Sequence, residues 1–232
     1  MGIFDFFYPK RCAGCGKTGT YFCPRCILSS KLHLQQVCPV CERLSIDGLT
    51  HIRCVQKVAP DGLTAVWAYE GAPRKLIGKL KYKFVEEIAL SLSSSASGML
   101  KIMERNSPYS PRWKKDKLAL VPVPLHWTRK NWRGFNHVEE VGKLLAGMMG
   151  WEVAPLLVRS VSTKPQVGLK GKERKKNIAG VFTLDPAYTL STVHYALILF
   201  DDVWTTGATM KEAAKVLKEA GFKKVWCLTL AR

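Results

Sequence analysis

Two adjacent carboxylates followed by a short loop rich in hydroxyl groups form the part of the chain best suited to bind a phosphorylated sugar. Carboxylates accept hydrogen bonds from vicinal ribose hydroxyls, and a glycine with small hydroxylic neighbours lets backbone N–H groups approach a phosphate closely. A helix that begins directly afterwards adds a favourable dipole. We therefore expect the acids to bind a ribose and residues 205–209, the hydroxylic loop, to bind its 5-phosphate. The segment reads Asp201-Asp202-Val203-Trp204-Thr205-Thr206-Gly207-Ala208-Thr209.

A purely structural interpretation of this segment is also possible. Thr-Thr-Gly can serve as a helix cap and turn, and an acid pair can simply be solvated at the end of a strand. We favour the binding interpretation because a strand, an acid pair, a hydroxylic loop and a helix follow one another in a single order. That combination is far more specific than a lone glycine motif.

A second set of chemically competent residues lies near the start, where seven of the eight cysteines precede residue 55. Two Cys-x-x-Cys knuckles can supply the four thiolates of a closed tetrahedral zinc site, and a later pair of knuckles offers three cysteines and a histidine. Disulfides are the alternative, but they are rare in cytoplasmic proteins. The pattern predicts one or two structural Zn²⁺ ions, with the pairing of knuckles left open. The candidate ligands are Cys12, Cys15, Cys23, Cys26, Cys38, Cys41, His51 and Cys54.

The charge of the chain points to anionic partners. Its 232 residues include 36 Lys and Arg against 18 Asp and Glu, a formal net charge of +18. Such a surface attracts nucleic acid or a highly phosphorylated small molecule, although a basic surface can also be inert. The chain has no run of about 18 apolar residues that could span a membrane and no signal-peptide pattern. We expect a cytoplasmic protein without membrane insertion.

The elements that must position these residues alternate along the chain after the cysteine-rich start. Near-continuous apolar strands separated by helices indicate an α/β fold with a parallel sheet covered on both faces. Ligands bind such sheets at the carboxyl ends of the strands, which is where the acid pair lies. We expect two domains, residues 1–58 and 59–232. Expected strands are residues 64–69, 118–123, 151–158, 181–184, 195–200 and 225–230, and expected helices are residues 73–83, 89–103, 138–148 and 210–220.

The acid pair and hydroxylic loop resemble the phosphoribosyl pyrophosphate (PRPP) motif of type I phosphoribosyltransferases. Further motifs resemble one subfamily, the ComF (ComFC/GntX) proteins linked to bacterial DNA uptake, and with the cysteine-rich start the resemblance covers nearly the whole chain. Those motifs are Val121-Pro122-Val123-Pro124-Leu125-His126, Arg133-Gly134-Phe135-Asn136, Tyr69-Glu70-Gly71, Leu80-Lys81-Tyr82, Lys164-Pro165-Gln166, Arg174, Asn177 and Phe182.

The resemblance implies a transferase-type site, a parallel sheet flanked by helices and a small N-terminal zinc-ribbon module. The two acids would be catalytic and contact the ribose hydroxyls of PRPP or ribose 5-phosphate, and Mg²⁺ would bridge ribose and pyrophosphate oxygens. The reaction would displace pyrophosphate at the anomeric carbon, with an acceptor that the sequence does not identify. The implied catalytic residues are Asp201 and Asp202; the implied PRPP-binding residues are Val203, Thr205, Thr206, Gly207, Ala208, Thr209, Pro124 and Leu125; further loop candidates are Arg133, Asn136, Arg174 and Asn177.

Four positions depart from the family patterns. Hypoxanthine-type enzymes place an acid where this chain has Thr205, which disfavours a 6-oxopurine salvage role. Trp204 replaces a smaller aliphatic residue and could either stack on a base or pack in the core. His137 replaces a glutamine, and the sequence offers no interpretation of this change. His51 stands where a cysteine is usual, and imidazole is a sound replacement because it binds zinc well.

A strongly basic stretch, residues 159–177, contains seven Lys and Arg and a single acid. In a transferase it would correspond to the flexible segment that closes over PRPP and excludes water. It could instead contact the phosphates of single-stranded DNA with help from rings such as Trp113, Trp127 or Trp132, or be only solvated. Two functions therefore stay open: a phosphoribosyltransferase, or a DNA-binding competence factor with a non-catalytic PRPP site. Other competence proteins are possible partners.

Overall fold

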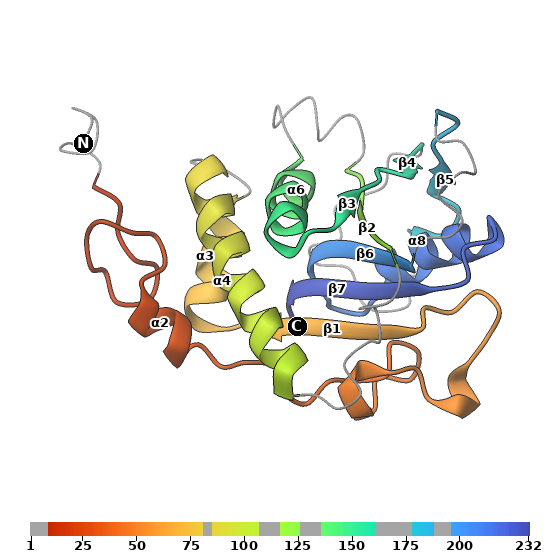
Figure 1. The fold of residues 1–232 in the computed structure, drawn as a ribbon, viewed down its shortest axis with the longest axis horizontal. Coiled ribbons are helices and arrows are strands. Elements are labelled where there is room, and N and C mark those ends of the chain that lie inside the picture. The colour runs from red at the N-terminus through yellow and green to blue at the C-terminus, as the bar shows by residue number, and fades with distance from the viewer. Residues whose placement is uncertain (1–8, 81–84, 107–116, 126–135, 161–177, 188–195) are drawn as a thin grey trace.

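A five-stranded parallel sheet with the order β1-β7-β6-β2-β3 organises the molecule (Figure 1). The computed structural model describes residues 9–80, 85–106, 117–125, 136–160, 178–187 and 196–232. β7 and the first five residues of β6 are buried because helices or loops cover both faces of the sheet. The strands are β1 (Gly62–Trp67), β2 (Leu118–Pro122), β3 (Glu152–Val153), β6 (Ala196–Val203) and β7 (Val225–Ala231).

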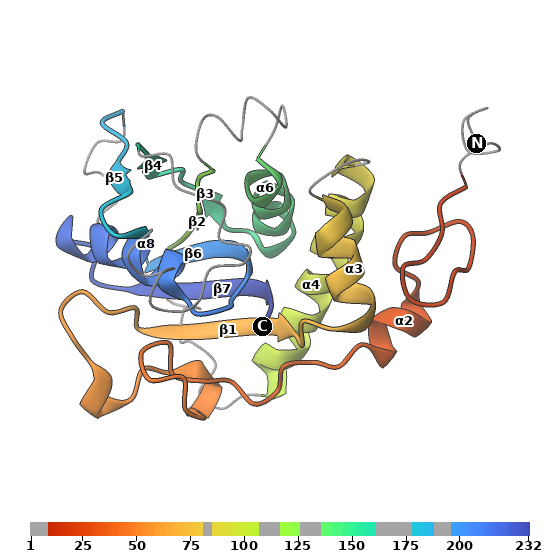
Figure 2. The same ribbon diagram turned by 180° about the vertical axis from the view of Figure 1, so that it is seen from behind.

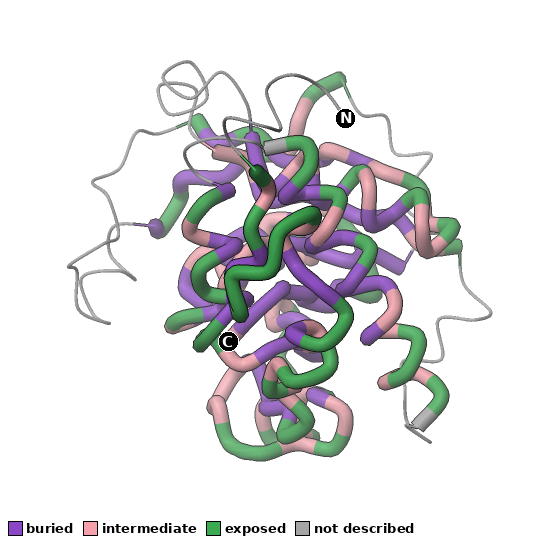
Figure 3. Tube along the Cα trace, turned by 90° about the vertical axis from the view of Figure 1, so that its left-hand side faces the viewer, coloured by how far each residue is buried: buried purple, intermediate pink, exposed green. Residues whose placement is uncertain are grey.

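Two apolar clusters fill the spaces between the sheet and its helices. One cluster joins α3, α4 and α6 to strand residues such as Ile198 and Phe200. The other joins α8 to residues of the opposite strand face, among them Leu199 and Cys227. Buried segments run through the interior and exposed ones lie at the periphery (Figure 3). The expected α/β class is confirmed. The helices are α3 (Gly71–Leu80), α4 (Val85–Asn106), α6 (His137–Met149) and α8 (Ala208–Glu219).

The predicted strand at residues 151–158 is wrong. The segment divides into β3, which pairs with β2, and β4 (Leu157–Arg159), which pairs antiparallel with β5 (Phe182–Leu184) in a separate two-stranded sheet. Pro155 lies between the two pieces and has no backbone N–H to donate to a ladder. The strand predicted at residues 181–184 therefore exists but does not belong to the parallel sheet.

Two element boundaries differ from the prediction in a way that matters for the site. β6 extends to Val203, so both acids lie within the strand, and α8 begins at Ala208 rather than at Met210. Only residues 204–207 connect strand and helix. Because this connection is short, the acid pair and the helix N-terminus are held close together.

The cysteine-rich start packs against the sheet domain at two places, as both ribbon views show (Figures 1 and 2). Its first part shares an apolar cluster with Leu76 of α3 and Trp67 of β1. Its second part forms bridges between Leu32 and Trp67 and between Leu49 and Gly62. The domain boundary at residues 58 and 59 stays a prediction. The short helices of this part are α2 (Pro24–Ser29), η1 (Ile46–Gly48) and η2 (Ile52–Cys54).

Among the described helices, none combines the length and apolar character needed to cross a membrane.

Candidate functional site

The acid pair lies at the carboxyl end of β6, which runs between β7 and β2 near the middle of the sheet. Asp201 is paired in register with Thr229 of β7, and both acids are partly exposed. The backbone N–H of Asp202 donates to Oδ1 of Asp201 at 2.8 Å. This bond orients the Asp201 carboxylate toward the backbone of its neighbour.

The hydroxylic loop forms a tight turn from β6 into α8. Gly207 caps the helix in the left-handed conformation, with φ of 65°. The Ala208 amide donates to Oγ1 of Thr206 at 3.4 Å, while Thr205 is exposed. The first backbone N–H groups of a helix have no partner within it and suit an anion. The loop and the acids are thus adjacent, as the phosphate interpretation requires.

Trp204 lies in the core directly against this loop. Its side chain is 2% exposed, and its backbone N–H donates to the carbonyl of Ala231 at 2.9 Å. A Cβ atom added to Gly207 would lie 2.0 Å from the Trp204 ring. Of the two roles left open by the sequence, the structure therefore places this tryptophan in the core. The close approach also explains why glycine follows the two threonines.

The loop candidates after β2 are only partly described. Pro124 and Leu125 are half-buried just beyond the strand, and the N–H of Val123 donates to the carbonyl of Phe200 at 2.9 Å. Asn136 is the N-cap of α6, where its side chain accepts a hydrogen bond from the Val138 amide at 3.1 Å. This cap fixes the start of α6 next to the acid pair. Three predicted positions, Arg133, Arg174 and Asn177, lie outside the described residues.

His137 is a site residue whose role sequence reasoning missed. Its imidazole Nε2 lies 3.3 Å from Oδ2 of Asp202, and its side chain is only 4% exposed. A protonated Nε2 at this distance donates to the carboxylate. The contact joins α6 to β6 across 65 residues of sequence, so no local pattern could reveal it. Only knowing that α6 begins beside the end of β6 would have suggested the pair.

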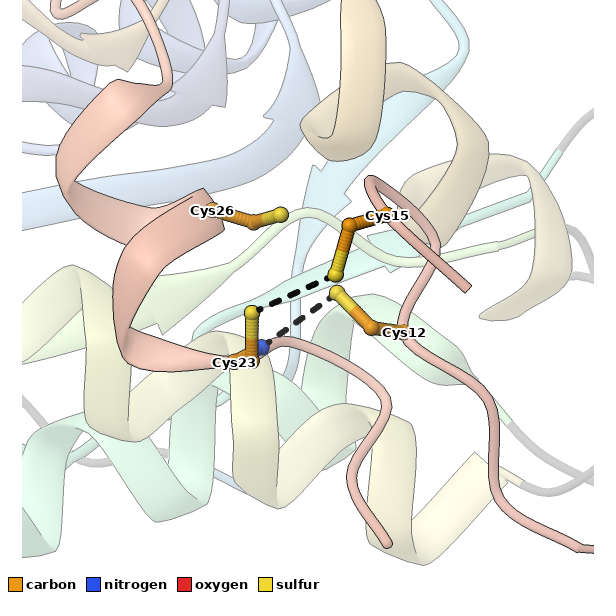
Figure 4. Close-up of side chains that lie close together, drawn as sticks. All are labelled: Cys12, Cys15, Cys23 and Cys26. Atoms are coloured by element: carbon orange, nitrogen blue, oxygen red, sulfur yellow. Dashed lines mark hydrogen bonds between the residues drawn. The ribbon is translucent and has the colours of Figure 1, made fainter. Parts of the chain in front are cut away.

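The first cysteine cluster brings Cys12, Cys15, Cys23 and Cys26 together, with their side chains pointing toward one another (Figure 4). All four sulfur atoms lie within 4.8 Å of one another, and those of Cys15 and Cys23 are 3.7 Å apart. In a tetrahedron with Zn–S bonds of about 2.3 Å, the sulfur–sulfur edges are about 3.8 Å. The cluster therefore has the chemistry and the spacing to hold structural zinc.

The second cluster, Cys38, Cys41, His51 and Cys54, has the same compactness. Nδ1 of His51 is 3.3 Å from the Cys41 sulfur, while Nε2 is 3.0 Å from the carbonyl of Leu44. A ligand histidine commonly donates its other ring N–H to a carbonyl, which leaves the facing nitrogen for the metal. Thus His51 does stand with three cysteines in a set that could hold zinc. Each cluster joins two knuckles that are consecutive in the sequence, and no residue belongs to both clusters.

Each cluster combines a thiol of lowered pKa with a thiol of raised pKa. Burial raises the pKa of Cys12, but backbone amide hydrogen bonds outweigh it and lower the pKa to about 6, whereas burial raises that of Cys26 to about 12. In the second cluster the amide of Arg43 lowers the pKa of Cys41 to about 6, and burial raises that of Cys54 to about 11. A divalent cation would compensate the clustered negative charge and let the remaining thiols ionise.

We predict that the two clusters bind zinc independently. Replacing Cys12 and Cys15 together with serine should remove one zinc equivalent from a protein that holds two, and replacing Cys38 and Cys41 together should remove the other. The reason is that the ligand sets share no residue. Elemental analysis of purified protein measures this. Loss of both ions in either double variant would show that the pairing is wrong.

Gly207→Ala should weaken binding of ribose 5-phosphate at least tenfold. Alanine in a left-handed conformation costs about 1–2 kcal/mol, and its Cβ would also strike Trp204. Calorimetric titration measures the affinity. The matched control is Gly221→Ala, which also has a positive φ, of 99°, but has open space around the added Cβ and lies at the far end of α8. Equal loss of affinity in both variants would contradict a specific role for the loop.

His137→Leu should weaken ribose 5-phosphate binding by up to about tenfold, because Asp202 would lose the contact that orients its carboxylate, and a hydrogen bond to a charged group contributes about 1.5–3 kcal/mol. His137→Gln should largely retain affinity, since its amide can donate to Asp202 from a similar distance. Thermal unfolding of both variants serves as the stability control. Equal affinity of His137→Leu and the parent protein would exclude a role for this contact.

Comparisons with known proteins agree on one family, although no family model matches the chain. The chain is 32% identical over 182 residues to the DNA utilization protein YhgH of Salmonella typhi, which covers 76% of this chain and 75% of that protein. It is 27% identical over 229 residues to the competence protein ComFC of Streptococcus pneumoniae, covering 95% and 87%. Competence protein F of Haemophilus influenzae is 33% identical over 116 residues, about half of each chain. The chain therefore belongs to the ComF/ComFC family.

Proposed function

We propose that this protein binds PRPP or ribose 5-phosphate at the end of β6 and acts as a phosphoribosyltransferase in DNA uptake. The observation that carries the proposal is the juxtaposition of the acid pair with a left-handed glycine at the N-terminus of α8. The carboxylates of Asp201 and Asp202 would accept hydrogen bonds from the ribose hydroxyls. The hydroxylic loop would surround the 5-phosphate with backbone N–H groups and threonine hydroxyls.

The leaving group would lie on the other side of the acid pair. Pro124 and Leu125 follow β2, the strand next to β6, and Asn136 and His137 begin α6 beside them. If pyrophosphate bound there, the anomeric carbon of the ribose would lie between the 5-phosphate on one side and the pyrophosphate on the other. Catalysis would come from orientation of the reactants and from neutralising charge on the departing pyrophosphate.

Magnesium is the metal that this arrangement suits. The acid pair supplies partly exposed carboxylate oxygens at the sheet edge, and Mg²⁺ prefers oxygen ligands that it shares with substrate phosphates. When bound, the ion would neutralise negative charge on the departing pyrophosphate. The chain's own residues would hold and orient the ribose.

The biological setting follows from the relatives and the charge. Relatives named for DNA utilization and competence suggest that this chain also serves DNA uptake. We expect it to act in the cytoplasm, together with other competence proteins. The net charge of +18 favours contacts with the phosphates of single-stranded DNA. The same charge supports a second candidate function, a DNA-binding competence factor whose PRPP site is regulatory rather than catalytic.

Replacing Asp201 and Asp202 together with alanine should abolish Mg²⁺-dependent PRPP binding, because the ribose hydroxyls would lose both acceptors. Calorimetry with PRPP and Mg²⁺ measures the binding. The matched control, Glu86→Ala with Glu219→Ala, removes two exposed carboxylates on the surfaces of α4 and α8 and should bind normally. Undiminished binding by the acid-pair variant would rule out the assigned site.

The same pair of proteins separates the two candidate functions. With bases and nucleic acids offered as acceptors, the enzyme should release pyrophosphate from PRPP faster than the acid-pair variant. PRPP binding with pyrophosphate release that never exceeds the variant's would favour the non-catalytic factor.

A further inference from the structure

A chain of charged contacts links the second cysteine cluster to the hydroxylic loop. Glu42 follows Cys41 directly, and its Oε1 lies 3.2 Å from Nζ of Lys211 in the first turns of α8. Lys211 Nζ in turn donates to the carbonyl of Thr206 at 3.4 Å and lies 5.5 Å from the centre of the Trp204 ring. One ammonium group therefore contacts the knuckle, the loop backbone and the ring that supports the loop.

The second cysteine cluster fixes the Glu42 end of this series of contacts. Glu42 has a positive φ of 59°, and its backbone N–H donates to the carbonyl of Cys38 at 2.9 Å. The Cys38 amide donates to the carbonyl of Arg43 at 2.9 Å. A non-glycine residue keeps such a conformation only when its surroundings determine it. Since Cys38 and Cys41 are both candidate ligands, a bound ion would hold the turn that places the Glu42 side chain.

A second cation, Arg232 directly after β7, also lies near Glu42. Arg232 Nη2 lies 3.9 Å from Oε2 of Glu42, and its Nη1 is 3.3 Å from Nε2 of His33. The Arg232 backbone is bonded to Trp67 and Tyr69, at the end of β1. The three charged side chains of Glu42, Lys211 and Arg232 are between 25% and 37% exposed. Partial shelter makes this network more effective than an isolated surface ion pair, whose contribution is about 0–1 kcal/mol.

We propose that Glu42 is a positioning residue through which the second cluster holds the hydroxylic loop in its ligand-binding conformation. Metal bound at the second cluster fixes the knuckle, the knuckle places Glu42, and Glu42 orients Lys211 against the Thr206 carbonyl. The inference rests on the proposed function, because the loop is taken to bind the 5-phosphate. It assigns the second cluster a role in ligand binding in addition to folding.

The first cluster provides the contrast. Its segment is joined to the sheet domain by an ion pair between Lys10 and Glu87 at 2.5 Å, and Glu87 belongs to α4. α4 packs in the apolar cluster of α3 and α6, whereas α8 belongs to the other cluster. The Lys10–Glu87 ion pair therefore lies against the helix cluster on the opposite side of the sheet from α8, and it supplies a matched control.

The test compares Glu42→Gln with Glu87→Gln in the full-length, zinc-loaded protein. Glu42→Gln should weaken ribose 5-phosphate binding about three- to tenfold and speed amide exchange in residues 204–211, with unchanged zinc content. Glu87→Gln should change neither quantity. Equal exchange at residues 204–211 in both variants would overturn the inference. Amide exchange needs no ligand, so failure of ribose 5-phosphate to bind would count against the proposed function alone.

A variant that loses the metal of the second cluster tests whether that cluster acts on the hydroxylic loop through Glu42. His51→Ala should release the ion of the second cluster and speed exchange at residues 204–211 as Glu42→Gln does. In the Glu42→Gln background it should add little further exchange there, because the connection is already broken. Additive effects of the two changes would show that the cluster acts on the loop by another route and would refute the proposed role of Glu42.

Discussion

The parallel pairing of β6 with β7 on one side and β2 on the other is the constraint on which the site depends. It carries Asp201 and Asp202 to the edge of the sheet, where the neighbouring strands deliver Ala231 and Val123 to hydrogen-bond the segments beside them. The short connection from β6 to α8 then brings a helix N-terminus to the acids. Every contact assigned to the ligand follows from this alignment of three strand ends.

Supporting groups around that edge come from distant parts of the sequence. α6 contributes His137 to one acid, Trp204 fills the space under Gly207, and Lys211 ties the loop to Glu42 of the second cysteine cluster. These contacts limit the positions that the loop and the acids can adopt. They also place the second cysteine cluster directly beside the hydroxylic loop.

Local patterns predicted the parts of this arrangement that depend on neighbouring residues. The acid pair, the hydroxylic loop and the eight candidate metal ligands could be recognised because each belongs to a short motif with its own chemistry. Which knuckles pair depends on the folded chain, and the structure groups them into two sets. Pro155 shows the limit: its missing N–H divides a long apolar run, and that run looked like one strand. Contacts such as His137 with Asp202 depend on strand order and helix placement, which periodicity does not contain.

A crystal structure of the protein with bound ribose 5-phosphate would test the proposed site. We predict phosphate oxygens within hydrogen-bonding distance of the backbone N–H groups of residues 206–209, with the ribose hydroxyls on the carboxylates of Asp201 and Asp202. Phosphate bound elsewhere on the molecule, with the hydroxylic loop and the acid pair contacting only water, would contradict it.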